Sequence, residues 1–228
     1  MTTLTSVRDT DPWRRRLYLP AYRVGDVARY THTTARTIEN WHYRETDSGI
    51  TLPGRERRRP LSYLELVEVA IVAIFRHFGV PLASIRRTRD YFAQTFQEEY
   101  PFAVYRFKTD GFHLLMNLKE FEPDVDIERL IVADRAGQLG WERMMADRLF
   151  EFDYEEELAI KWHVAGRQSP VLIDPRVAFG APMVRGIPTW VLKGRWTAGE
   201  SIEDIKVDFE LESEEIQHGL EFEGIEFN

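Results

Sequence analysis

Histidines and acidic side chains are the residues of this chain best suited to hold a metal or move protons. The six histidines (32, 42, 77, 113, 163 and 218) are scattered, and no pair has metal-ligand spacing. Asp124, Asp126 and Asp134 could lie near each other, but a Pro-Asp-Val-Asp segment is more typical of an exposed loop. No Gly-x-Ser-x-Gly elbow is present. We therefore expect no catalytic residue, no metal site, no cofactor and no enzyme.

A second candidate is the glycine-containing stretch AFGAPMVRGIPTWVLKGRWTAGESIEDI, residues 178–205. Its glycines match neither the dinucleotide-binding nor the P-loop spacing, and no Lys-Ser or Lys-Thr pair follows. The stretch instead predicts short helices, with Thr189 capping the first, Ser201 and Asp204 forming a capping box, and Ser213 opening the third. We expect a compact three-helix unit with a core of Trp190, Leu192, Ile202, Ile205, Phe209, Ile216 and Leu220.

Side chains that hydrogen-bond phosphates and base edges gather in residues 22–44. This segment predicts two short helices joined by a tight turn, with Val24, Val27 and Ala28 on the first and Ile38 and Trp41 on the second. Thr33 or Thr34 is a plausible N-cap of the second helix. That helix has a polar face suited to a DNA major groove. The face consists of Arg36, Thr37, Asn40 and Arg44. An ordinary helical hairpin with a solvated polar face would have the same pattern.

Two arginine clusters flank this pattern. GRERRRP places Arg55, Arg57, Arg58 and Arg59 between Gly54 and Pro60, as in a basic loop or wing. Arg14, Arg15 and Arg16 follow Trp13 in a segment, 1–19, that we expect to be a flexible arm. Either cluster alone is more often solvated surface, but together they favour DNA.

The next helices have clear start and stop signals. In LSYLELVEVAIVAIFRHFGVP, Ser62 and Glu65 predict a capping box, and Gly79 with Pro81 predicts the end. A further helix is expected over 82–99. It is either the seam of a homodimer or a helix that closes its own domain's core.

The middle of the chain predicts a small α+β unit. Residues 102–118 indicate two strands around a turn, and a helix is expected near 137–149. Alternation then places Phe150, Phe152 and Tyr154 on one face. This unit could be a bridge, a dimer element or a ligand pocket.

Composition and charge limit the class of protein. Hydrophobic content of 43%, charged content of 30%, no cysteine, no signal peptide and no membrane-spanning run predict a cytoplasmic protein without membrane association. Residues 1–90 hold 16 Lys+Arg and 10 Asp+Glu, a net of +6, and the remaining residues have a net of −14. This asymmetry favours two different partners, or two domains of different pI.

Two parts of the chain resemble known families. YRVGDVARYTHTTARTIENWHY, followed by the arginine loop and LSYLELVEVAIVAIFRHFGVPLASIR, resembles the winged helix-turn-helix domain of MerR-type regulators. The final segment is similar to a small domain of bacterial antitoxins, and with the preceding KWHVAGRQSPVLIDP it resembles VapB-type antitoxins paired with PIN-like ribonucleases. Its matching residues are Asp174, Pro175, Gly180, Pro182, Arg185, Gly186, Gly199, Ser201, Asp204 and Ile205.

The resemblance implies a type II toxin–antitoxin partnership. The C-terminal region would bind and silence a PIN-like RNase, and the N-terminal domain would bind the promoter of its own operon on double-stranded DNA. Residues 200–228 hold 11 Asp+Glu against one Lys, a charge complementary to an RNA-binding surface. The candidate partner-binding residues are Arg185, Arg195, Trp196, Glu210 and Glu212.

We thus expect an α+β chain with four parts. They are a basic arm (1–19), a MerR-like winged helix-turn-helix DNA-binding domain (20–99), an α+β middle unit (100–167) and an antitoxin domain (168–228). The alternative is a MerR-like effector-sensing transcription regulator with a small-molecule site in residues 102–165.

Overall fold

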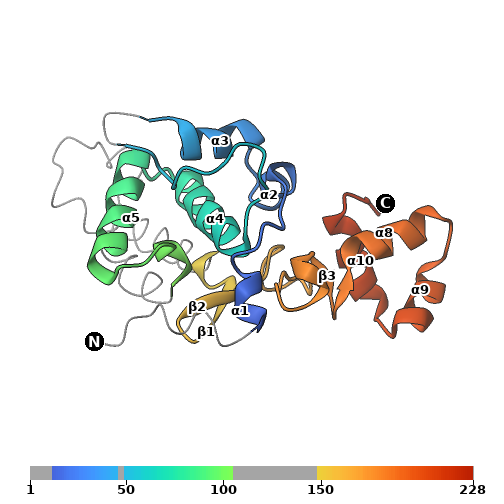
Figure 1. Cartoon of the computed structure of the whole chain (residues 1–228). Coiled ribbons are helices and arrows are strands. Elements are labelled where there is room, and N and C mark those ends of the chain that lie inside the picture. The colour runs from blue at the N-terminus through green and yellow to red at the C-terminus, as the bar shows by residue number, and fades with distance from the viewer. Residues whose placement is uncertain (1–11, 46–48, 105–147, 228) are drawn as a thin grey trace, which may run out of the picture. The chain divides into compact units, whose positions relative to one another are not determined.

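The computed structural model describes residues 12–45, 49–104 and 148–227. Within these ranges the protein is mixed α+β, as predicted, with helices predominating over short strands (Figure 1). The described residues form two compact units, each considered by itself. The N-terminal unit comprises the described residues of 18–150 together with 154–159, and the C-terminal unit comprises 12–17, 151–153 and 160–227.

The N-terminal unit is built around one long helix. Its elements are α2 (Val24–Tyr30), α3 (Ala35–Tyr43), α4 (Tyr63–His77), α5 (Leu82–Phe96) and the 3-10 helix η2 (Pro101–Ala103). Helix α4 contacts α2, α5 and η2, and most of its side chains are buried, including Leu66, Val67, Ile71 and Phe75. An apolar surface this wide exceeds what one amphipathic stripe provides, so α4 is the core of the unit.

The predicted boundaries of α4 are confirmed. The Ser62 Oγ accepts the Glu65 N–H at 3.2 Å, and the Glu65 carboxylate accepts the Ser62 N–H at 2.6 Å. This capping box satisfies two N–H groups that the first turn leaves without partners. The helix is capped at its other end by Phe78, and Gly79 follows with a φ of 81°, which glycine adopts without strain.

Helix α5 ends three residues earlier than predicted, because Gln97 takes a left-handed conformation with a φ of 57°. Ile85 and Phe92 are buried within the unit, where α5 contacts α4 and η2. This packing matches the alternative in which α5 closes its own core, and the homodimer stays a prediction.

Residues 102 and 103 were predicted as the start of a strand and instead lie in η2. The Phe102 ring packs edge-on against Phe75 at 6.3 Å, so burial of this aromatic ring favours a tight turn over α4. The remainder of the predicted strands, and the predicted helix up to residue 147, lie outside the described residues.

The C-terminal unit contains small strands and three short helices. Its elements are α1 (Pro12–Arg16), η6 (Ala178–Gly180), β3 (Met183–Val184), β4 (Ile187–Pro188), α8 (Thr189–Thr197), α9 (Ile202–Phe209) and α10 (Ser213–Phe222). A further two-stranded sheet, β1 (Phe152–Glu155) and β2 (Leu158–Trp162), has residues in both units. Residues 105–147 of the predicted middle unit, 100–167, lie outside the described residues, and its described residues are assigned partly to each unit, so a separate middle unit stays a prediction.

Strands β3 and β4 form an antiparallel hairpin with Val184 opposite Ile187. Its two turn residues, Arg185 and Gly186, have φ values of 46° and 87°. Positive φ at both positions is the signature of a type I′ turn, the geometry that matches strand twist. Arg185 and Gly186, which are among the residues that match the antitoxin domain, therefore form the turn of this hairpin.

Helices α8 and α10 pack closely through a glycine. A Cβ at Gly219 would lie 2.7 Å from the Cδ1 of Leu192, so the approach needs the absence of a side chain. Leu192, Ile205, Ile216 and Leu220 are buried, as predicted. Ser201 and Asp204 form the predicted capping box of α9.

Three predictions for this part of the chain are wrong. Thr189 is not an N-cap, because Pro188 holds that position and the Thr189 hydroxyl instead donates to the Glu223 carboxylate at 2.6 Å. Trp190 is 63% exposed rather than part of the core. Phe150 lies in a turn before β1 and is exposed, whereas Phe152 is buried, so the two do not share a face.

Residues 12–16, predicted as part of a flexible arm, form helix α1 instead. The Arg16 guanidinium donates to the Arg176 carbonyl at 3.2 Å, and the Arg176 guanidinium lies 5.5 Å from the centre of the Trp13 ring. A cation over an indole face is a favourable electrostatic contact. These contacts explain why α1 belongs to the C-terminal unit.

Candidate nucleic-acid interface

Helix α3 carries the candidate base-reading side chains. Thr34 is its N-cap, with the Thr34 hydroxyl accepting the Thr37 N–H at 3.1 Å, which selects Thr34 over Thr33. Ile38 and Trp41 are buried and fix one side of the helix on the unit's core. The predicted polar residues Arg36, Asn40 and Arg44 are exposed, while Thr37 is half-buried and shares a hydrogen bond with Thr34.

The loop after α3 is anchored to the end of that helix. The N–H groups of Thr51 and Leu52 donate to the Trp41 carbonyl at 3.1 and 2.9 Å, and both residues are buried. Beyond this anchor, Arg57 and Arg58 are exposed, and the Arg57 guanidinium lies 5.4 Å from the Tyr43 ring centre. The exposed basic residues of this loop and the polar face of α3 thus belong to one compact unit.

The other two loop arginines have different surroundings. Arg59 is half-buried and lies 3.8 Å from the Glu65 carboxylate. Arg55 is half-buried, and its Nε and Nη2 atoms are buried without a hydrogen-bond partner among the described residues. In this conformation Arg57 and Arg58 are better placed than Arg55 to contact a phosphate backbone.

Arg14, Arg15 and Arg16 lie in the other compact unit, on α1. Arg14 is half-buried over the Trp13 ring, with 5.2 Å between the guanidinium carbon and the ring centre. Arg15 and Arg16 are exposed, so a contact with DNA by these residues stays a prediction.

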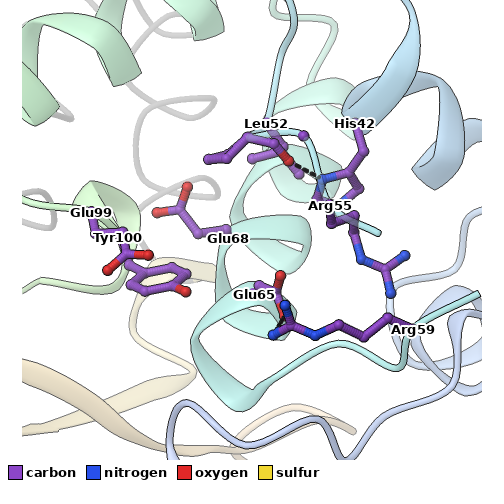
Figure 2. Close-up of a pocket in the computed structure, with 10 residues that line it drawn as sticks. His42, Leu52, Arg55, Arg59, Glu65, Glu68, Glu99 and Tyr100 are labelled. Carbon is purple, nitrogen blue, oxygen red and sulfur yellow. Dashed lines mark hydrogen bonds and ion pairs between the residues drawn. The ribbon is translucent and has the colours of Figure 1, made fainter. Parts of the chain in front are cut away.

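A pocket of about 140 Å³ lies beneath the loop (Figure 2). It is lined by the end of α3, the loop start, the first turns of α4 and the residues after α5, namely His42, Leu52, Pro53, Gly54, Arg55, Arg59, Glu65, Glu68, Glu99 and Tyr100. Burial lowers the pKa of His42, against the hydrogen bond to Pro53, and the Arg55 charge lowers it further. Burial also raises the pKa of Tyr100, and the Glu99 carboxylate acts in the same direction.

The predicted partner-binding residues are engaged within the C-terminal unit. The Arg195 guanidinium pairs with both Glu200 and Asp208 and lies 5.3 Å from the Phe209 ring centre. The Arg185 guanidinium donates to the Glu210 carbonyl at 3.0 Å and lies 3.6 Å from the Glu215 carboxylate.

The remaining two candidates also have structural contacts. Glu212 caps α10 and lies 3.2 Å from the Lys206 ammonium, and Trp196 packs edge-on against Phe227 at 5.7 Å. Two carboxylates already hold Arg195, so a contact between Arg195 and a protein partner has to compete with these pairs, and its role in partner binding stays a prediction.

Sequence reasoning missed the exposed apolar side chains of this unit. Phe179 is 87% exposed, Val207 is 74% exposed and Trp190 is 63% exposed. Phe179 also has a φ of 54°, a left-handed conformation that is uncommon for a bulky residue. Helical spacing could have indicated the exposure of Trp190. Trp190 lies two residues before the buried Leu192, and residues two apart point to different sides of a helix.

Among the residues that the structure describes, no group of three or more His, Cys, Asp or Glu could hold a metal ion. Asp124, Asp126, Asp134 and His113 lie outside those residues. In the same described ranges, no helix is long and apolar enough to cross a membrane.

Comparison with known proteins gives a family match and structural likenesses. Residues 171–222 match a family described as a protein of unknown function, DUF433. No curated protein matches the sequence. The X-ray crystal structure of Rv2018 from Mycobacterium tuberculosis is similar, with 21% sequence identity, a TM-score of 0.71, and coverage of 90% of this chain and 99% of that one. At this identity the likeness shows a shared fold.

Proposed function

We propose that this protein is a cytoplasmic DNA-binding antitoxin that neutralises a PIN-like ribonuclease and represses its own operon. The observation that carries the DNA-binding half is the arrangement of α3. Its apolar side is fixed by the buried Ile38 and Trp41, while Arg36 and Asn40 are exposed on the polar side. Arg and Asn at such positions pair bidentately with guanine and adenine in a major groove.

The loop after α3 supports the same proposal. Arg57 and Arg58 are exposed on the unit that presents α3, and arginine contacts to phosphates position a protein without reading sequence. In the winged helix-turn-helix resemblance of residues 20–92 this loop would be the wing, although its sequence departs from the family's wing pattern.

The antitoxin half rests on the resemblance of the C-terminal segment and on its surface. Residues 200–228 combine 11 acidic residues with one lysine, and Phe179, Trp190 and Val207 are exposed large apolar side chains of the same unit. Exposed aromatic anchors are typical of protein interfaces, and an acidic surface complements a protein that binds RNA.

A DNA-binding measurement tests the first half. Replacing Arg36 and Asn40 with Ala removes sequence preference between the promoter and a scrambled duplex. Replacing Arg57 and Arg58 with Ala weakens binding to both duplexes and lowers the slope of log affinity against log salt by up to about two. Unchanged promoter affinity in both double variants contradicts the assignment of α3.

Co-purification tests the second half. The chain, expressed from its own gene neighbourhood, should retain a small protein that arrests growth when expressed alone. If charge complementarity dominates, this complex weakens as salt is added. A chain that purifies alone yet binds its promoter favours the second candidate, a MerR-like effector-sensing regulator. The observation favouring that candidate is the pocket beneath the loop, although its lining differs from the predicted 102–165 segment.

A further inference from the structure

The two exposed arginines of the loop after α3 lie at the tip of a tight turn. The Arg59 N–H donates to the Glu56 carbonyl at 3.3 Å, so Arg57 and Arg58 are the central residues of a four-residue turn. Arg58, the third residue, has a φ of 67°, the sign that a type II turn requires at that position. The direction of this turn therefore decides where both guanidinium groups lie.

The far end of the loop is fixed on the chain before α2. Leu61 and Tyr22 form an antiparallel bridge, in which the Leu61 N–H donates to the Tyr22 carbonyl at 2.7 Å. Both residues are buried. The loop is thus held at this end, and the place of its tip depends also on the anchor at the other end.

The near end of the loop is held by two helices through one residue. The Thr51 N–H donates to the Trp41 carbonyl of α3 at 3.1 Å. The Thr51 hydroxyl oxygen accepts the Arg86 Nε–H of α5, also at 3.1 Å. Thr51 is 3% exposed and Arg86 is 6% exposed, so this bond lies inside the N-terminal unit, where water cannot readily replace it. Thr51 therefore links the loop to both α3 and α5.

We propose, on the basis of the DNA-binding function proposed above, that Arg86 is a positioning residue for DNA. Through Thr51 it holds the loop where Arg57 and Arg58 reach the phosphates while α3 reads the bases. The guanidinium is rigid and is carried by a helix, and a side chain held by a packed element positions its partner more closely than a loop can.

Loss of this hydrogen bond should affect the loop more than α3. Helix α3 keeps its own anchors, the buried Ile38 and Trp41. The loop would lose its link to α5, and its tip could then shift. A guanidinium–phosphate hydrogen bond needs its atoms within about 3 Å, so a small shift of the tip removes the contact.

Two properties of DNA binding separate these effects. Phosphate contacts set how steeply affinity falls with salt, and base contacts set the preference for one sequence. A released loop should therefore lower the salt slope and leave the promoter preference unchanged. A variant that is only less stable should change neither property, because its folded molecules keep both kinds of contact.

The test is fluorescence anisotropy of the full chain with promoter and scrambled duplexes over a range of salt concentrations. Thr51→Val removes the hydroxyl but keeps the branched side chain, and should lower the slope of log affinity against log salt by up to about two, as in Arg57→Ala/Arg58→Ala. Arg86→Met, which removes the donor, should do the same. Thr51→Ser keeps the acceptor and should retain the wild-type slope. Arg87→Met, at the exposed neighbouring residue, is the matched control and should also retain it.

A combined variant tests the link between the buried bond and the tip. With Arg57 and Arg58 already replaced by Ala, Thr51→Val should lower the slope no further, because the contacts that the loop positions are gone. Circular dichroism checks that each variant folds, and if Arg86→Met does not, the comparison of Thr51→Val with Thr51→Ser still decides.

Several results would overturn the positioning role alone and leave the proposed function in place. They are a wild-type slope in Thr51→Val or in folded Arg86→Met, a loss of promoter preference in Thr51→Val, an equal fall in Arg87→Met, or a further fall in the combined variant. A wild-type chain that binds neither duplex overturns the proposed DNA-binding function and the role of Arg86 together.

Discussion

Two arginines, one in each compact unit, form ion pairs in opposite surroundings. In the N-terminal unit the Arg89 Nε lies 2.7 Å from the Glu68 carboxylate, with side chains 9% and 3% exposed. In the C-terminal unit Arg195 pairs with Glu200 and Asp208, with side chains 30%, 32% and 54% exposed. The first pair is taken out of water, while the second is screened by it.

The difference reflects how each unit is held together. The N-terminal unit surrounds a fifteen-residue helix with apolar side chains, so a polar group inside it must find partners in the core. In the C-terminal unit, α8, α9 and α10 have eight to ten residues each and are held by capping and by a close glycine contact. Four substitutions, from the largest expected effect to the smallest, test this contrast.

The buried pair gives the largest effect. Glu68→Ala leaves the Arg89 charge buried and the Phe102 N–H without its acceptor, which should reduce the free energy of unfolding by about 3–5 kcal/mol. Arg195→Ala, at the exposed pairs, should change it little. Urea denaturation measures the free energy of unfolding of both variants. An equal reduction in Arg195→Ala and Glu68→Ala would contradict the difference between the buried and the exposed pairs.

The glycine contact comes next. Gly219→Val places side-chain atoms where Leu192 already lies, which should destabilise the C-terminal unit by roughly 1–3 kcal/mol. Gly194→Ala, in α8 with open space around it, should instead stabilise the helix by up to about 1 kcal/mol. Thermal denaturation followed by circular dichroism compares the two. A stabilised Gly219→Val variant would show that Leu192 can move aside.

The capping contact of α9 is smaller. Ser201→Ala removes the hydroxyl that accepts the Asp204 N–H, which should lower the free energy of unfolding by about 1 kcal/mol. Ser213→Ala is the control, because Glu212 rather than Ser213 holds the N-cap of α10. Equal effects of the two substitutions in urea denaturation would contradict the capping role of Ser201.

The smallest effect is the pH dependence from His42. Burial lowers its pKa below the ordinary 6.5, so below that pH the unfolded state binds more protons than the folded state. The contribution of His42 to the free energy of unfolding is therefore complete above pH 6.5. It is lost as the pH falls through the lowered pKa that His42 has in the folded state. Urea denaturation at pH 7.5 and 5.5 should show a smaller loss of stability in His42→Gln than in the wild type.

Local signals in the sequence predicted local structure well. Ser62 with Glu65, Gly79, Thr34, and Ser201 with Asp204 each lie where their hydrogen bonds or backbone angles require that residue type. Residues whose place depends on distant parts of the chain were predicted less well. Thr189 bonds Glu223, 34 residues away, and Phe102 packs on a helix that ends at His77, so neighbouring residues do not reveal either contact.

The candidate site shows the same division. The polar positions of α3 follow from helical spacing, and three of the four are exposed as predicted. The buried guanidinium atoms of Arg55 and the pocket around His42 depend on how the loop after α3 packs back against that helix. A run of arginines in the sequence does not predict that packing. Trp190 and Leu192 were both expected in the core of the C-terminal helices, but only Leu192 is buried.

The membership of α1 in the C-terminal unit has a consequence for the order of synthesis. Arg16 and its partner Arg176 are 160 residues apart, and the chain of the N-terminal unit lies between them. At about 5–20 residues per second, a ribosome makes that interval in roughly 10–30 s. During this time helix α1 has been synthesised, but Arg176, which it contacts in the folded protein, has not. The N-terminal unit can therefore fold first, and the C-terminal unit closes only when translation is nearly complete.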